Sequence, residues 1–154
     1  MRKTILLSAL VLFIAGAFLF AASHDAHMGN WKLNEAKSKL SSPARNTTVI
    51  YEAAGDKIKI TVDGVDRDGK PSHNEWVGMF DGKEYPVTGD PNTDARSYKL
   101  VDDHTLELTN TKGGKVTTSG KIVVSADGKT RTVTTSGTNP EGKKVENIAV
   151  YDKQ

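Results

Sequence analysis

The chain of 154 residues contains no cysteine. A disulfide, a cysteine nucleophile and a lipid-modified cysteine anchor are therefore excluded. The sequence also lacks a His-Glu-x-x-His zinc motif and a Gly-x-Ser-x-Gly nucleophile elbow. No motif supports catalysis and no cofactor is predicted, so a hydrolase or isomerase that uses carboxylates is only the third functional hypothesis.

Long apolar runs are missing except near the N-terminus. There, Arg2 and Lys3 precede an apolar run over residues 5–20 and the small residues Ala21-Ala22-Ser23. This order is typical of a secretory signal peptide. The alternative is a transmembrane anchor, which the small residues and the polar segment 24–27 disfavour. We expect a signal peptide over 1–23, a flexible leader over 24–28 and a single domain over 29–154.

An excess of charge of one sign is also lacking. The chain has 21 basic and 19 acidic residues, and removal of Arg2 and Lys3 with the signal peptide cancels the formal net charge of +2. A neutral surface gives no electrostatic footprint for nucleic acid or for an anionic membrane. We therefore expect a periplasmic or secreted monomer, with no nucleic-acid partner and no stable membrane insertion after signal cleavage.

Helical periodicity is missing beyond the signal segment, and turn motifs take its place. Steps built from acidic residues or glycine and ending in lysine recur along the chain, as at Asp68-Gly69-Lys70, Asp81-Gly82-Lys83, Asp127-Gly128-Lys129 and Glu141-Gly142-Lys143. Glycine supplies the positive backbone angles that tight hairpins need. Between the turns, Val, Thr, Ile and Tyr alternate with a period of two, which is the signature of β-strands. About ten strands with short connections result.

The predicted fold class is all-β. Sequential strands with short links are antiparallel neighbours. An open meander of 8–10 strands would leave two exposed edges, so closure into an up-and-down barrel is favoured. The alternative is a two-sheet β-sandwich, which would need a long crossover that the sequence does not show.

The two ends of the domain resemble calycin barrels, the lipocalins and intracellular fatty-acid-binding proteins. The resemblance is carried by Gly29-Asn30-Trp31, a Gly-x-Trp on the first strand, and by the closing strand Ala149-Val150-Tyr151-Asp152-Lys153. It implies that Gly29 and Trp31 form a structural plug at the closed end and that the interior holds a small apolar or amphipathic molecule. The chain lacks the helical lid and the C-terminal helix of these families, so the resemblance does not extend to a fatty acid. It is also similar to small secreted bacterial proteins that have no assigned activity.

Acidic turns and histidines are the candidate metal ligands of the chain. Asp66, Asp68 and Glu75 match part of a calcium loop, and Asp90, Asn92 and Asp94 form a second oxygen-rich group. Pro71 interrupts the first loop, and carboxylates in turns usually cap backbone N–H groups. The four histidines, His24, His27, His73 and His104, show no zinc-ligand spacing. No metal is predicted.

Aromatic residues are few, at 6% of the chain, and two of them indicate a ligand site. Trp76 and Phe80 share one face of a predicted strand and flank Gly78. A glycine between two rings either relieves crowding or marks a place where a ligand comes close. The alternative is that both rings only fill the core.

Arg131 is the third candidate ligand-binding residue. It lies in phase with Val133 and Thr135 on a predicted strand, which favours an inward direction. There it would either stack on Trp31, as a basic residue does in lipocalins, or bind the acidic head of a ligand. If the face assignment is off by one residue, Arg131 is solvated instead.

These patterns predict an exported, lipocalin-like barrel that binds a small, mostly apolar molecule in its interior without catalysis. The alternative is a filled barrel that acts through its surface as an envelope or protein-interaction module. The abundance of Ser and Thr where a lipid cavity would need Leu and Phe favours this alternative.

Overall fold

A computed structural model describes residues 23–138 and 141–154, so the predicted signal peptide lies outside the described residues except for Ser23. The described chain forms ten strands and two 3-10 helices. The helices are η1 (Asp25–His27) and η2 (Glu35–Lys37). The strands are β1 (Gly29–Leu33), β2 (Arg45–Ala54), β3 (Lys57–Val65), β4 (Pro71–Gly78), β5 (Asp81–Thr88), β6 (Ala95–Asp102), β7 (Thr105–Lys112), β8 (Lys115–Val124), β9 (Thr130–Thr138) and β10 (Lys144–Lys153).

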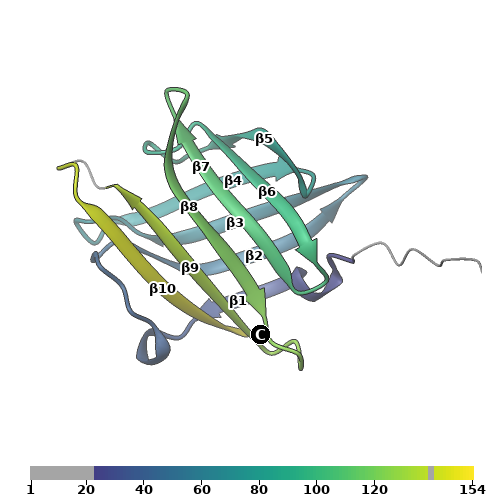
Figure 1. Ribbon diagram of the computed structural model, residues 1–154. Coiled ribbons are helices and arrows are strands. Elements are labelled where there is room, and N and C mark those ends of the chain that lie inside the picture. The colour runs from purple at the N-terminus through teal and green to yellow at the C-terminus, as the bar shows by residue number, and fades with distance from the viewer. Residues whose placement is uncertain (1–22, 139–140) are drawn as a thin grey trace, which may run out of the picture.

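The ten strands form one closed antiparallel barrel, which confirms the predicted fold class (Figure 1). Each strand pairs with the next along the chain, and β1 closes the ring against β10 through Trp31↔Lys153 and Leu33↔Tyr151. Closure pairs every strand on both sides and so removes the exposed edges of an open sheet.

The acidic-glycine turns sit at the hairpins that the sequence predicts, with one shift. Gly69 and Gly128 adopt φ values of 77° and 72°, which only glycine reaches without strain. The predicted turn at Asp81-Gly82-Lys83 is instead the start of β5, where the register against β6 shifts between Asp81 and Glu84. The chain reverses earlier, at residues 79–80.

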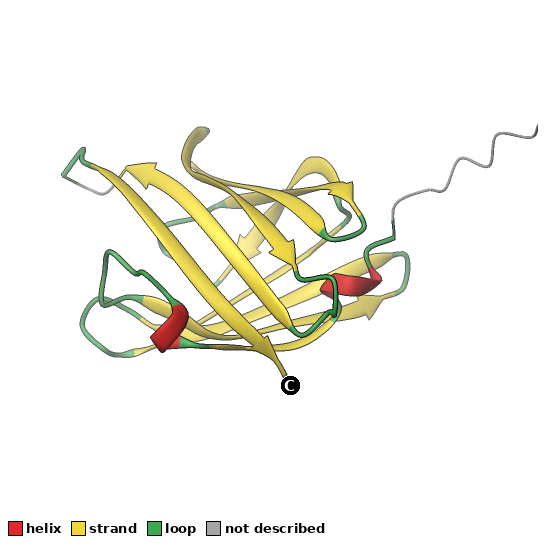
Figure 2. Ribbon diagram, turned by 60° about the horizontal axis from the view of Figure 1, so that its bottom comes forward, coloured by secondary structure: helices red, strands yellow, loops and turns green. Residues whose placement is uncertain are grey.

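The up-and-down order sends alternate hairpins to opposite ends of the barrel. The β2–β3, β4–β5, β6–β7 and β8–β9 connections share one end with η1, which enters there before β1. Figure 2 shows η1 and η2 lying far apart on the barrel. We call the end that carries η1 the closed end. Within the described residues, neither helix is long and apolar enough to cross a membrane.

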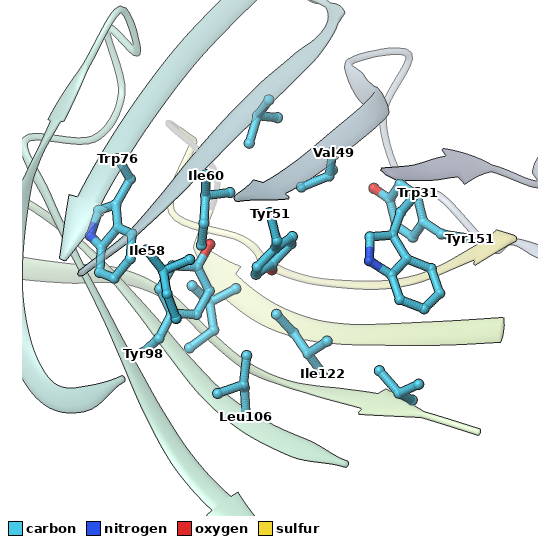
Figure 3. Packing of buried hydrophobic residues seen from close by; sticks show 13 residues of the cluster. Trp31, Val49, Tyr51, Ile58, Ile60, Trp76, Tyr98, Leu106, Ile122 and Tyr151 are labelled. Carbon is cyan, nitrogen blue, oxygen red and sulfur yellow. The ribbon is translucent and has the colours of Figure 1, made fainter. Parts of the chain in front are cut away.

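The core fills the barrel with side chains that alternate inward along the strands, and β5 contributes only the partly buried Tyr85 and Val87. Tyr51 of β2 lies between Trp76 and Tyr98 on one side and Trp31 and Tyr151 on the other (Figure 3). All five residues are at most 4% exposed. Burying such large rings supplies much of the hydrophobic stabilisation of a small domain that has no disulfide.

The pairing between β4 and β5 is the weakest in the barrel. The two strands match at only two positions, Glu75↔Thr88 and Trp76↔Val87. Most residues of β5 are exposed. Sparse pairing and sparse burial lower the free energy of local opening. We therefore expect the β4–β5 hairpin, which carries Phe80, to open more readily than the fully paired parts of the wall.

Candidate ligand site in the barrel interior

The sequence places Trp76 and Phe80 on one strand, but β4 ends at Gly78 and Phe80 lies in the β4–β5 connection. The two side chains still meet at the core. Their rings stack with centroids 6.3 Å apart, and Tyr98 contacts both rings at 4.8 and 5.7 Å. The Trp76 indole is 1% exposed and its Nε1–H donates to the Arg96 carbonyl oxygen at 2.8 Å. Trp76 is thus held in place by the barrel wall, whereas Phe80, in the β4–β5 connection, is only partly buried.

Gly78 provides room for aromatic packing. A Cβ atom at this position would lie 2.5 Å from Cγ of Tyr85 and 2.6 Å from Cζ2 of Trp76. Two rings therefore occupy the space over the glycine. Of the two interpretations of Gly78, the geometry favours relief of crowding.

An open hollow of about 500 Å³ lies at the closed end, next to Phe80. Its apolar lining comes from Ile58, Leu100 and Met79, and its charged lining from Asp56, Lys57 and Asp81. The His24 ring also lines it and meets the edge of Phe80 at a centroid distance of 5.9 Å. The volume falls in the range of small-molecule pockets. An apolar group in this hollow would touch Phe80 before any other ring of the core.

Trp31 closes the barrel beneath η1. Its side chain is 0% exposed, and its Nε1–H donates to the carbonyl oxygen of His27 at 2.9 Å. Gly29 precedes it with φ 104°, a conformation that side chains rarely adopt. The ammonium group of Lys153 lies 5.2 Å from the Trp31 ring centroid. The first strand, the last strand and η1 therefore meet on one indole.

The segment 24–28, predicted as a flexible leader, instead contains η1 and supplies a core residue. His27 is 0% exposed, and neither ring nitrogen has a hydrogen-bond partner. Burial, followed by the positive charge of Arg131, lowers the pKa of His27 from its ordinary 6.5 to about 4. His27 is therefore a neutral imidazole at pH 7.

Arg131 points into the interior and is 3% exposed, which excludes the solvated alternative. Its guanidinium carbon lies over three aromatic rings, at 4.8 Å from Tyr51, 5.1 Å from Tyr151 and 5.7 Å from Trp31. Each distance is within the range of a cation–π interaction. The expected stacking on Trp31 is present, although Tyr51 and Tyr151 lie closer.

The Arg131 guanidinium has unused hydrogen-bonding capacity. Nε and Nη1 are buried without a partner, and no ion pair with a described carboxylate exists. His104 Nδ1 is also buried and unpartnered, whereas the buried Tyr51 hydroxyl interacts with the Tyr98 side chain. Burial raises the pKa of the Tyr51 hydroxyl, so this group stays a neutral donor. Unpaired buried polar groups are uncommon and costly in folded proteins.

A second buried arginine, Arg96, was not singled out from the sequence. It is 7% exposed, and its Nε donates to Asn110 Oδ1 at 2.6 Å and its Nη1 to Asn74 Oδ1 at 3.4 Å. Asp90 lies 3.8 Å from its Nη2. The alternation of Arg96 with Tyr98 on one strand carries the same signal that placed Arg131 inside.

The carboxylates considered for calcium serve as turn caps and ion-pair partners. Asp66 Oδ1 accepts hydrogen bonds from the backbone N–H groups of residues 68 and 70, and Glu75 pairs with Lys59 at 2.7 Å. Asp94 pairs with Lys112 at 2.7 Å. Over residues 23–138 and 141–154, no cluster of three or more His, Asp or Glu side chains is arranged to hold a metal.

The outer face of β7–β10 forms an open groove of about 840 Å³. Thr132, Thr134 and Ser136 lie on the face of β9 opposite to inward-pointing Arg131 and Val133. They line the groove together with Thr109, Ser119, Lys121, Glu107 and Glu146. The groove is rich in hydroxyl groups and carries charges of both signs.

Comparisons with known proteins identify no family for this chain. No protein-family model matches the chain, and no curated protein matches it. Among solved structures, a redesigned β-barrel, mFAP1, bound to DFHBI, is similar, with 15% identity and a TM-score of 0.46, over 86% of this chain and 100% of that one. A likeness of this degree adds nothing to what the barrel itself shows.

Proposed function

We propose that this protein is an exported, calycin-like barrel that binds a small amphipathic acid at its closed end, without catalysis. The observation that carries the proposal is Arg131, a permanently charged side chain buried with two unused donors and no carboxylate partner. A planar guanidinium binds a carboxylate by donating two parallel hydrogen bonds, and it resists deprotonation even when it is buried. An acidic ligand would satisfy these donors.

The apolar part of the ligand has a place on the same side of the barrel. Phe80 borders the hollow at the closed end and contacts Tyr51 at 6.3 Å, and Tyr51 in turn lies under the Arg131 guanidinium. A ligand that enters beside the weakly paired β4–β5 hairpin would meet Phe80 first and reach Trp76 behind it. Displacement of Phe80 would then bring its acid group toward Arg131.

The test is a comparison of acids with their matching alcohols. Long-chain and isoprenoid acids and alcohols are titrated while Trp fluorescence is followed, because Trp31 and Trp76 both lie at the proposed site. A charge-assisted hydrogen-bond pair is worth about 1.5–3 kcal/mol, so the acid should bind roughly tenfold tighter or better. Arg131→Gln should remove this preference and leave the affinity of the alcohol nearly unchanged.

Lys121→Gln is the matched control, because it also removes one cation from an adjacent strand but lies on the outer face. It should bind acid and alcohol as the wild type does. Equal binding of acid and alcohol by the wild type would reject the role of Arg131.

The alternative function is a filled barrel that acts as an envelope or protein-interaction module. The direct packing of Trp76, Phe80 and Tyr98 on one another favours it, since these rings already occupy the interior beside the hollow. In that case the hydroxyl-rich groove on β7–β10 is the working surface. Absence of binding by every amphiphile in the titration would support this alternative.

Export rests on the signal-peptide pattern of residues 1–23. N-terminal sequencing of the protein from a periplasmic or secreted fraction should give His24 as the first residue, because Ala21 and Ser23 are the small residues that precede the best cleavage point. Sedimentation of that material should show a monomer. Recovery in a membrane fraction with residues 1–20 attached would contradict export as a soluble protein.

A further inference from the structure

The closed end gathers more hydrogen-bonding groups than a carboxylate–arginine pair requires. Arg131, His27 and His104 each contribute a buried polar atom without a partner, and the buried Tyr51 hydroxyl lies under the Arg131 guanidinium within reach of Tyr98. They come from η1, β2, β9 and the β6–β7 turn, so separate parts of the chain converge on one region. An inert core would place apolar atoms here, because each unpaired polar group costs about 1–3 kcal/mol.

The other buried arginine, Arg96, differs from Arg131 because its guanidinium has protein partners. Arg96 has Asn110, Asn74 and Asp90 arranged around its guanidinium. Arg131 instead has aromatic rings below it and the neutral imidazole of His27 close enough to feel its charge. Rings hold a cation in position but accept no strong hydrogen bonds, which leaves the N–H groups of Arg131 available to an anion.

We infer that the closed end is an oxyanion site in which Arg131 and His27 hold the anion together, and that His27 takes up a proton when the anion binds. The inference rests on the role that the proposed function gives to Arg131, and it adds His27 and a coupled proton. The oxyanion is either the acid group of an interior ligand or a small free anion.

The charges around His27 explain why the proton arrives with the anion. Arg131, His104 and His24 disfavour the imidazolium, and only Asp102 favours it. The Asp102 carboxylate is already engaged by the backbone N–H of His104 and makes no ion pair with His27. A bound anion would place a negative charge between Arg131 and His27, reverse the balance, and raise the pKa of His27 from about 4.

The consequence is an affinity that depends on pH even for an anion whose own charge is fixed. Below the raised pKa of the complex, each unit of pH decrease should tighten binding up to tenfold, and the gain should stop near pH 4, where the free protein is itself protonated. An anion that enters beside the β4–β5 hairpin reaches His27 past Phe80, whose ring centroid lies 6.4 Å from that of His27.

The experiment uses decanesulfonate and inorganic sulfate as probes, with decanol as the neutral control. From pH 4 to 8 decanesulfonate keeps one negative charge and sulfate keeps two. Trp fluorescence gives the affinity, and ring NMR signals of the histidines give the pKa of His27 with and without each probe. Wild type should bind decanesulfonate at least tenfold tighter at pH 5 than at pH 7, with a raised His27 pKa. His27→Gln should bind without this pH dependence.

His73→Gln is the matched control, since His73 is an exposed histidine on β4 that pairs with Asp63 and does not line the hollow. It should retain the pH dependence. Decanesulfonate binding that is independent of pH, or equally dependent in His27→Gln, overturns the inference while the proposed function stands.

If decanesulfonate does not bind, the sulfate titration distinguishes the oxyanion site from the proposed amphiphile-binding function. If sulfate alone raises the pKa of His27, and Arg131→Gln abolishes the effect, the oxyanion site is supported and the amphiphile function is rejected. If neither probe changes the pKa of His27, the inference is wrong. The thermal unfolding curve of each variant, measured without probe at pH 7.5, shows that the comparison is made between folded proteins.

Discussion

The burial of neutral His27 should make the fold sensitive to acid. The folded-state pKa of His27 is about 4, lowered first by burial and then by Arg131, against an ordinary value of 6.5 in the unfolded chain. Between these values the unfolded state binds more protons than the folded state. The contribution of His27 is therefore fully present above pH 6.5, declines as the pH falls, and is lost by about pH 4. The loss amounts to about 3 kcal/mol.

The assay is the free energy of unfolding in urea, measured for wild type and His27→Gln from pH 8 to pH 4. Other titratable groups also change protonation in this range, but their contributions cancel in the difference between the two proteins. Among them is His73, whose pKa is raised by its hydrogen bond to Asp63 and whose effect has the opposite sign. The wild type should lose about 3 kcal/mol more than the variant.

Parallel pH profiles for the two proteins would refute this reasoning, because they would show that His27 is hydrated or paired in solution. His24→Gln serves as the control for removing a histidine from the same segment. Its profile should follow that of the wild type in the decline attributed to His27.

Two further substitutions test the packing. Trp31→Ala should lower the free energy of unfolding by about 3–5 kcal/mol, since it removes a fully buried indole and its hydrogen bond to η1, and a loss below about 1 kcal/mol would make the Gly-x-Trp likeness coincidental. Gly78→Ala should cost about 1–3 kcal/mol by overpacking against Tyr85 and Trp76, whereas Val77→Ala, on the exposed face, should change stability by less than about 0.5 kcal/mol in the same urea titration.

The strand order and the closure of the barrel could be predicted because they depend on local signals. Glycines such as Gly69 and Gly128 mark hairpins through a backbone conformation that other residues avoid, and short links make neighbours antiparallel. The turn predicted at Asp81-Gly82 was wrong, because a positive φ at Gly82 is also compatible with an irregular start of a strand. There the pairing with β6 decides the structure, and pairing is a tertiary property.

The partners of the site residues were harder to predict than their directions. Alternation placed Arg131 inside and would have placed Arg96 there too, because side-chain direction in a strand has a period of two. It could not show that Arg96 meets Asn110, which lies on another strand at a register that only the folded barrel defines. The burial of His27 was missed for a related reason. A single helical turn has no periodicity, and the Trp31 indole that holds it is itself a tertiary partner.

Removing the charge should lower the free energy of unfolding at Arg96 and leave it nearly unchanged at Arg131. This difference distinguishes an arginine that stabilises the fold from one that is available to bind a ligand. Arg96→Met leaves Asn110 and Asp90 without their partner in a partly buried site, which costs about 1–3 kcal/mol for each group. Arg131→Met loses three cation–π contacts of about 0.5–2 kcal/mol each but also removes two unpaired buried donors, so the terms nearly cancel. In urea unfolding at pH 7.5, Arg131→Met should therefore stay within about 1 kcal/mol of the wild type, while Arg96→Met falls clearly below it. If Arg131→Met proves as destabilising as Arg96→Met, then Arg131 is a structural clamp on Trp31, and its unused donors give no reason to expect a ligand.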